Sequence, residues 1–220
     1  MVRAGPGDAR VANQANCKGG AISAQKINMK SNTQNIQRGP MADAFDVSVR
    51  TPSDINEHLP MLYFLAQQCD HITEFGVRTG ASTLAFLHGL QGRRATLRSY
   101  DINDRFGVHK TMAPHTTADW TFSICSTLAI SQIEETDLLF VDTLHRYDQV
   151  RQELAIHGDA ARRWIVFHDT ETFGVTGDDG GEGINRAIDG WLVVEPQWRV
   201  VYRTHRNNGL TVIEREGANE

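Results

Sequence analysis

Polar side chains that could do chemistry follow several apolar runs of this sequence. Asp101, Asp142 and the pair His168–Asp169 each end such a run, and the glycine-rich stretch 74–83 ends another. In an open parallel sheet, ligands bind at the carboxyl ends of the strands. Carboxylates at that edge can hold a divalent cation, and a histidine can accept a proton near neutral pH. The pattern therefore predicts one site that combines these groups.

The glycine-rich stretch lies between a predicted strand, 71–76, and a predicted helix, 81–90. Gly76 and Gly80 would let a ligand approach the backbone at the helix N-terminus. A pyrophosphate-binding turn has glycine two residues after the first one, where this chain has Arg78. Asp101 follows the next strand, where a carboxylate can accept hydrogen bonds from both ribose hydroxyls. The turn predicts binding of an adenosine compound without phosphates, with a plain tight turn as the alternative.

These groups need a sheet that brings the strand ends together. Near-continuous apolar runs predict parallel strands at 71–76, 97–101, 120–124, 137–142 and 163–169. Helical periodicity predicts helices from Thr51, with a kink or a true start near Pro60, and at 81–90, 146–161 and 184–193. Two alternating runs, 198–205 and 209–215, flank an Asn-Gly pair that predicts a hairpin. We therefore expect an α/β fold of five parallel strands that ends in an antiparallel hairpin.

The charge divides the chain near Met41. Residues 1–40 contain six Lys or Arg and one Asp, which gives this segment a net charge of +5. Because the whole chain has a net charge of −5, the remaining residues have a net charge of −10. The basic segment has few large apolar side chains, which predicts a disordered leader, with an organelle transit peptide as the alternative. Residues 41–220 are predicted to form a single domain, too acidic to favour nucleic acid. Three scattered cysteines and the lack of a membrane-length apolar run predict a cytoplasmic protein without a membrane partner.

Five stretches together resemble class I S-adenosylmethionine-dependent methyltransferases. They are EFGVRTGAST (74–83), YDIND (100–104), FVDTLHRYD (140–148), IVFHDT (165–170) and NNGLTVIER (207–215). Within this family the chain is most similar to the branch that includes cephalosporin-hydroxylase-like and macrolide-sugar O-methyltransferases. The resemblance covers roughly residues 50–215. It implies a Rossmann-like, doubly wound, mostly parallel seven-stranded sheet with a C-terminal antiparallel hairpin.

The resemblance also implies roles in binding S-adenosylmethionine. Glu74 would lie near the methionine amino group, Asp101 would hold the ribose, and Ser126 would contact the adenine. Ser82 or Thr83 would cap the following helix or face the methionine carboxylate. The predicted cofactor-binding residues are Glu74, Gly76, Arg78, Gly80, Ser82, Asp101, Ser126 and Asp142.

The methyl acceptor has to lose a proton, and two kinds of group could assist. Asp142 and Asp169 could hold a divalent cation, and oxygen ligands favour Mg²⁺, Mn²⁺ or Ca²⁺ over Zn²⁺. Related catechol enzymes have Asp-Asn after the fifth strand, where this chain has Asp169–Thr170, so a third ligand is unassigned. Its candidates are the loop acids Glu171, Asp178, Asp179 and Glu182. The predicted catalytic residues are His145 and His168, as alternative general bases or structural residues, and Asp169.

We therefore predict an S-adenosylmethionine-dependent methyltransferase that O-methylates a small hydroxylated, sugar-like acceptor, with metal assistance left open. An NAD-dependent oxidoreductase is one alternative, against which Arg78 argues, and a non-catalytic adenosyl-binding protein is another. Segments 104–119 and 174–183 are predicted to be loops over the substrate, the second a flexible lid. Relatives in this branch often form oligomers, so a homo-oligomer is left open.

Overall fold

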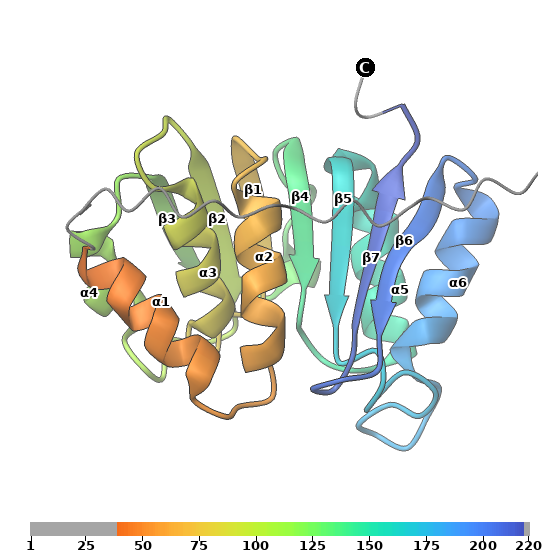
Figure 1. Cartoon of the computed structure of the whole chain (residues 1–220). Helices are drawn as coiled ribbons and strands as arrows, with labels where there is room; N and C mark the ends of the chain where they lie inside the picture. Colours follow the sequence, from red (N-terminus) through yellow and green to blue (C-terminus); the bar gives the residue numbers. More distant parts are fainter. Residues whose placement is uncertain (1–38, 218–220) are drawn as a thin grey trace, which may run out of the picture. The chain divides into compact units, whose positions relative to one another are not determined.

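The computed structural model describes residues 39–217, which contain a seven-stranded sheet with helices on both faces (Figure 1). The strands are β1 (His71–Phe75), β2 (Thr96–Asp101), β3 (Asp119–Ile124), β4 (Thr136–Val141), β5 (Ala161–His168), β6 (Trp198–Thr204) and β7 (Leu210–Arg215). Their order is β3-β2-β1-β4-β5-β7-β6; β1 to β5 are parallel, and β7 is antiparallel to both neighbours. The predicted fold class is confirmed. The predicted leader, 1–40, lies outside the described residues except for its last two positions.

The chain passes from one half of the sheet to the other between β3 and β4. β2 and β3 lie on one side of β1, whereas β4 pairs with β1 on its other side. Such a reversal leaves a crevice at the carboxyl ends of the two central strands, where open α/β sheets bind ligands. Gly76 and Asp142 follow these strands directly, and the Asp142 amide donates to the Phe75 carbonyl over 2.8 Å. The fold thus places the glycine-rich turn beside the acid that ends β4.

Helices cover the two faces of the sheet. α1 (Pro40–Arg50), α2 (Leu59–Ala66) and α3 (Ala81–Leu90) lie in front of it in Figure 1, whereas α5 (Tyr147–His157) lies behind it, next to α6 (Ile184–Val194). Alternate side chains of β4 serve the two faces: Leu138 and Phe140 pack with α1–α3, and Leu139 and Val141 pack with α5 and α6. This burial on both faces explains the near-continuous apolar runs of the sequence.

Three helical segments add to or refine the predicted elements. α1 is an addition; it begins at Pro40, whose fixed φ suits the first turn of a helix. α2 begins at Leu59 with Pro60 in its first turn, so the predicted alternative of a true start near this proline is correct. Segment 104–119 contains α4 (Val108–Met112) and a 3-10 helix (Ala113–His115). No helix within residues 39–217 has both the length and the hydropathy needed to cross a bilayer.

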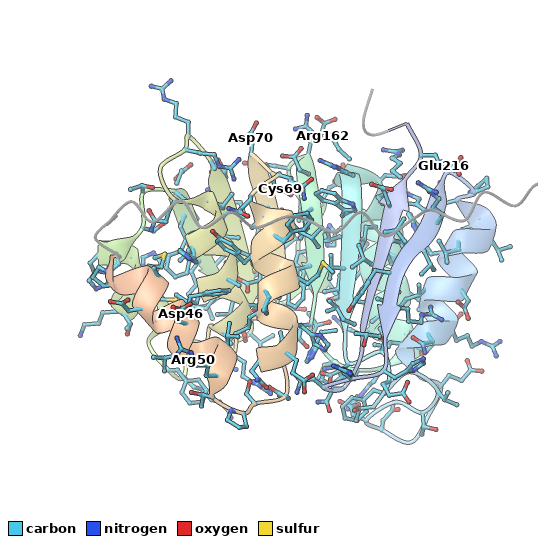
Figure 2. The ribbon with its side chains drawn as sticks, in the orientation of Figure 1. Asp46, Arg50, Cys69, Asp70, Arg162 and Glu216 are labelled. Atoms are coloured by element: carbon cyan, nitrogen blue, oxygen red, sulfur yellow. The ribbon has the colours of Figure 1, made fainter. Side chains whose placement is uncertain are left out.

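The two edges of the sheet carry different parts of the molecule. Figure 2 places Asp70 and Arg162 at the upper edge, where β1 and β5 begin. The strand ends that precede Asp142 and Asp169 are at the lower edge, next to the loop that leads to α6. The residues predicted to do chemistry are therefore gathered at the lower edge.

Candidate active site

The glycine-rich turn after β1 fits tightly against its neighbours. Gly76 has a φ of +87°, and a Cβ atom there would lie 1.9 Å from the carbonyl oxygen of Asp142. Gly80 has a φ of +80°, and a Cβ atom there would lie 2.6 Å from a methyl group of Val108 in α4. Both positions therefore require glycine. Glycine is also the residue that lets a backbone approach a ligand closely. The turn is also where the polar backbone amides of the site converge.

Asp101, at the end of β2, holds this turn by its carboxylate. One oxygen accepts hydrogen bonds from the amides of Val77 and Arg78, at 2.8 and 2.9 Å. The other oxygen accepts from the Asn103 amide at 3.1 Å. Arg78 adopts a φ of +44°, and its guanidinium pairs with the Asp54 carboxylate at 2.6 Å. Asp101 thus lies beside the turn, as predicted, while the Arg78 side chain is directed to the segment before α2.

Glu74 and Ser82 are buried and hydrogen-bonded to each other, which bears on the predicted cap of the following helix. Glu74 is fully buried, and its two carboxylate oxygens accept hydrogen bonds from Ser82, Thr83 and Ser99 at 2.6–2.8 Å. Burial raises the pKa of Glu74 to about 7, although the three hydroxyls oppose that shift. Gly80, with no side-chain cap, precedes α3, so the predicted cap by Ser82 or Thr83 is wrong. Both Glu74 oxygens already accept hydrogen bonds within the protein, and a role near the methionine amino group stays a prediction.

A cavity of about 230 Å³ opens at the carboxyl ends of β1 to β4. Four predicted cofactor residues line it: Gly76, Asp101, Ser126 and Asp142. It also contains Ile102 and Leu144, whose apolar side chains are 69% and 47% exposed. Two open apolar side chains beside a carboxylate suit a flat base attached to a ribose. Ile102 could have been found from the sequence, because it follows the predicted ribose-binding acid directly.

A buried acid on α5 braces the floor of this cavity. Glu153 accepts hydrogen bonds from Thr127 at 2.6 Å, Gln149 at 2.8 Å and Thr143 at 2.9 Å. Burial raises the pKa of Glu153, and these donors oppose the shift. Ser126 caps the 3-10 helix Thr127–Ala129 by accepting from the Leu128 amide at 3.3 Å. Glu153 therefore ties the ends of β3 and β4 to α5.

The four residues Asp142, His145, His168 and Asp169 form a compact group, here called the Asp–His cluster. His145 Nε2 lies 2.8 Å from Asp169 Oδ2. His168 Nδ1 lies 3.3 Å from both Asp142 Oδ1 and Asp169 Oδ2. The predicted catalytic and metal-binding residues are thus brought together by the ends of β4 and β5. Asp142 also lines the cavity, so the cluster adjoins it.

Charge pairing sets the protonation of the Asp–His cluster. Burial by itself would lower the pKa of both imidazoles, but the two carboxylates raise it to about 9 for His145 and about 10 for His168. Burial would raise the pKa of Asp142 and Asp169, but the imidazoles hold both below the ordinary range. Without a further cation, both imidazoles are therefore protonated at neutral pH. A protonated imidazole cannot accept another proton.

The donors of the cluster fit a divalent cation. One atom each from Asp142, His168 and Asp169 lies within 4.8 Å of the others. Asp169 Oδ1 is buried and has no hydrogen-bond partner, so the carboxylate has spare ligand capacity. The loop acids predicted as third ligands are engaged elsewhere. Glu171 pairs with His205, Asp178 and Asp179 with Arg146, and Glu182 with Arg186.

The loop between β5 and α6 is an ordered wall of the site. The Asp178 amide donates to the His145 carbonyl at 3.1 Å, and the Tyr147 amide donates to the Glu182 carbonyl at 3.0 Å. The Phe173 ring stacks on the His145 imidazole with centroids 4.6 Å apart and an angle of 5°. The loop predicted as a flexible lid is therefore hydrogen-bonded to the residues that follow β4.

No protein-family model matches the chain, and no curated protein matches it significantly. Solved methyltransferases do resemble it. The O-methyltransferase TomG from Streptomyces achromogenes, involved in tomaymycin synthesis and solved with S-adenosylmethionine, is 18% identical with a TM-score of 0.56, over 80% of this chain and 86% of TomG. An O-methyltransferase from Bacillus cereus, solved with S-adenosylhomocysteine, is 16% identical with a TM-score of 0.58, over 83% of this chain and 93% of that enzyme.

The N-methyltransferase NodS from Bradyrhizobium japonicum, with S-adenosylhomocysteine, gives 14% identity and a TM-score of 0.54, over 80% of this chain and 98% of NodS. At such identities the likeness establishes the fold, and the reaction has to be argued from the site. The chain has the fold of class I S-adenosylmethionine-dependent methyltransferases, as its sequence motifs imply.

Proposed function

We propose that this chain is an S-adenosylmethionine-dependent methyltransferase that O-methylates a small hydroxylated acceptor in the cytoplasm. One observation carries the proposal: Asp142 lines the cavity of about 230 Å³ at the strand ends and also belongs to the Asp–His cluster. A methyl donor bound in the cavity would therefore lie next to groups that can hold a proton. The fold shared with TomG and the Bacillus cereus enzyme supports a methyltransferase, and the choice of an oxygen acceptor rests on the Asp–His cluster.

The cavity offers a partner to each part of the adenosine. The Asp101 carboxylate would accept hydrogen bonds from the ribose hydroxyls, and Ile102 and Leu144 would contact the base. The turn at Gly76 would leave room for the methionine part to pass the backbone. This arrangement would direct the sulfonium methyl group towards the Asp–His cluster.

Methyl transfer joins the acceptor oxygen to the methyl carbon as the bond from that carbon to sulfur breaks. The acceptor hydroxyl loses its proton, and His145, in its neutral form, is the better placed of the two predicted bases to take it. Its side chain is 25% exposed, whereas that of His168 is 2% exposed and is bonded to the Asp54 carbonyl through Nε2. The Asp169 carboxylate, 2.8 Å from His145 Nε2, would stabilise the imidazolium that results.

A divalent cation held by Asp142 and Asp169 would lower the pKa of the acceptor hydroxyl and of the neighbouring imidazole. The two carboxylates would position the acceptor in line with the methyl group. Metal assistance is thus part of the proposal, because the buried Asp169 oxygen and the converging donors support it.

A second cavity supports a polar, sugar-like acceptor. It has a volume of about 400 Å³ and shares Leu144 and Gln149 with the cofactor cavity. The rest of its lining is mostly polar or charged, from Arg146, Tyr147, Asp148, Gln152, Asp179, Gly181 and Glu182. Such a lining offers donors and acceptors to several hydroxyl groups.

Calorimetric titration of the full chain with S-adenosylhomocysteine, and separately with NAD, tests the proposal. Binding of S-adenosylhomocysteine alone, weakened at least about tenfold in Asp101→Ala, is expected from the loss of a charged hydrogen-bond acceptor. Binding of NAD instead would favour an oxidoreductase and contradict the proposal. If S-adenosylhomocysteine binds but neither the wild type nor any cluster variant shows turnover, the chain would be a non-catalytic binding protein.

A further inference from the structure

We infer that His168 is the third ligand of the cluster's cation, which makes the site selective for a transition metal over Mg²⁺ or Ca²⁺. The inference rests on the proposed function, which places a cation between Asp142 and Asp169. It changes the chemistry expected of the site, because three oxygen ligands would favour Mg²⁺ or Ca²⁺.

Two of the three distances between the donor atoms are those of ligands around one ion. His168 Nδ1 lies 3.3 Å from Asp142 Oδ1 and 3.3 Å from Asp169 Oδ2. Ligands about 2.1 Å from one metal ion are roughly 3.0–3.4 Å apart in octahedral or tetrahedral arrangements. All three donor atoms lie within 4.8 Å of one another, so a cation would have to draw the two carboxylates together only where their distance exceeds this range.

The Asp54 backbone fixes which nitrogen of His168 faces the carboxylates. His168 Nε2 lies 3.1 Å from the Asp54 carbonyl oxygen, which only accepts hydrogen bonds, so Nε2 carries a proton. In the neutral ring, the Nδ1 lone pair then faces Asp142 and Asp169. Metal-binding histidines commonly donate their other N–H group to a carbonyl oxygen in this way. The Asp54 carbonyl thus presets His168 as a ligand.

Asp169 supplies a second, independent observation. Its side chain is 6% exposed, and its Oδ1 atom is buried without a hydrogen-bond partner. A buried carboxylate oxygen without a partner is costly, and buried charges in proteins are normally paired or bound to metal. The backbone at Asp169 has a φ of +60°, a conformation that other residues than glycine rarely adopt.

The donor set decides which metals the site prefers. An imidazole nitrogen suits Mn²⁺ less strongly than Fe²⁺, Co²⁺ or Zn²⁺, and it suits Mg²⁺ and Ca²⁺ poorly. Two carboxylates and one imidazole leave further positions on such an ion for an acceptor hydroxyl. The rival occupant is a proton on Nδ1, which would satisfy both carboxylates without any metal.

The test is calorimetric titration of the metal-stripped full chain with CoCl₂, ZnCl₂ and MgCl₂, together with the visible absorption of bound Co²⁺. We expect Co²⁺ and Zn²⁺ to bind at least about tenfold more tightly than Mg²⁺. His168→Gln should lose this preference and change the Co²⁺ spectrum. His168→Glu, which makes all three ligands oxygen donors, should reverse the preference towards Mg²⁺. His109→Gln, which removes an exposed histidine of α4, is the control and should behave as wild type.

Equal affinity for Mg²⁺ and Co²⁺ in the wild type, or a Co²⁺ spectrum that His168→Gln leaves unchanged, would overturn the inference. The inference would also be overturned if none of the three metals bound, because a proton on His168 Nδ1 would then take the place of the ion. The calorimetric titration with S-adenosylhomocysteine separates this result from the proposed function. Failure of that ligand to bind would refute the methyltransferase and leave the measured metal preference standing.

Discussion

Asp142 Oδ1 lies 3.3 Å from His168 Nδ1, which connects the cavity at the strand ends to the Asp–His cluster beside it. The two residues are 26 positions apart in the sequence. They meet because Asp142 follows β4 and His168 ends β5, and these two strands are neighbours in the sheet. Through this contact the cavity and the Asp–His cluster share Asp142 and form one continuous site.

Gly76→Ala should lower the free energy of unfolding by about 2–4 kcal/mol and abolish cofactor binding. The added Cβ atom would lie 1.9 Å from the Asp142 carbonyl oxygen, and φ is +87°. Gly92→Ala is the matched control, because Gly92 has a φ of +74° and no atom within 4 Å of such a Cβ. It should cost only about 1–2 kcal/mol. Chemical denaturation measures both, and equal losses would contradict the tight turn at Gly76.

Ile102→Ser should weaken the binding of S-adenosylhomocysteine by about tenfold. Ile102 is 69% exposed in the cavity, and covering it with a base would bury apolar surface worth about 1–1.5 kcal/mol. Ile124→Ser removes an isoleucine that is 63% exposed and lies outside the cavity lining, so its binding should match wild type. Calorimetry on the three proteins compares them directly. Similar losses in both variants would place the base elsewhere.

Glu74→Gln should reduce the dependence of stability on pH. The folded-state pKa of Glu74 is about 7, raised from an ordinary value of 4.5, so the folded protein binds the extra proton between these values. The stability that this proton contributes is fully present below pH 4.5 and is lost as the pH rises through 7. The wild type should therefore lose up to about 3 kcal/mol from this group, and the variant should not. Denaturation at pH 5 and pH 8 measures the difference; identical slopes would refute the buried acid's role.

Asn207→Ala should destabilise the protein by about 1–3 kcal/mol and reduce turnover without changing cofactor affinity. The Asn207 side chain donates to the Ser53 carbonyl at 2.6 Å and accepts from the Glu57 amide at 3.0 Å. It thereby holds the segment whose Asp54 carbonyl contacts His168. Asn207→Gly is the control for the backbone, since φ is +45° at this position. If the glycine variant keeps full turnover, the side-chain contacts do not position the site.

Most of the fold could be predicted because each central strand is buried on both faces and therefore reads as an apolar run. The hairpin could be predicted because its turn needs residues that tolerate positive φ, and Asn207, Asn208 and Gly209 supply them. α1 could not be predicted from apolar periodicity, because only Met41 and Phe45 of its eleven residues are buried.

The Asp–His cluster could be predicted because the end of a parallel strand fixes where the next residue lies, whatever its side chain. The role of Glu74 could not, because its partners come from α3 and from Ser99 of β2. Those contacts depend on packing across elements. His168 as a ligand also depends on a distant residue, Asp54, whose carbonyl sets the tautomer of the ring.

The most direct test of the account is transfer of a labelled methyl group from S-adenosylmethionine to a panel of sugar-like hydroxylated acceptors, by wild type and Asp142→Asn. Each would be tested with Mg²⁺, Co²⁺ and chelator, and S-adenosylhomocysteine affinity would be measured in parallel. We predict transfer by the wild type, at least about a hundredfold slower transfer by Asp142→Asn, and cofactor affinity that changes by less than about tenfold. Equal transfer by the two proteins would show that Asp142 does not take part in the reaction and would contradict the proposed role of the Asp–His cluster.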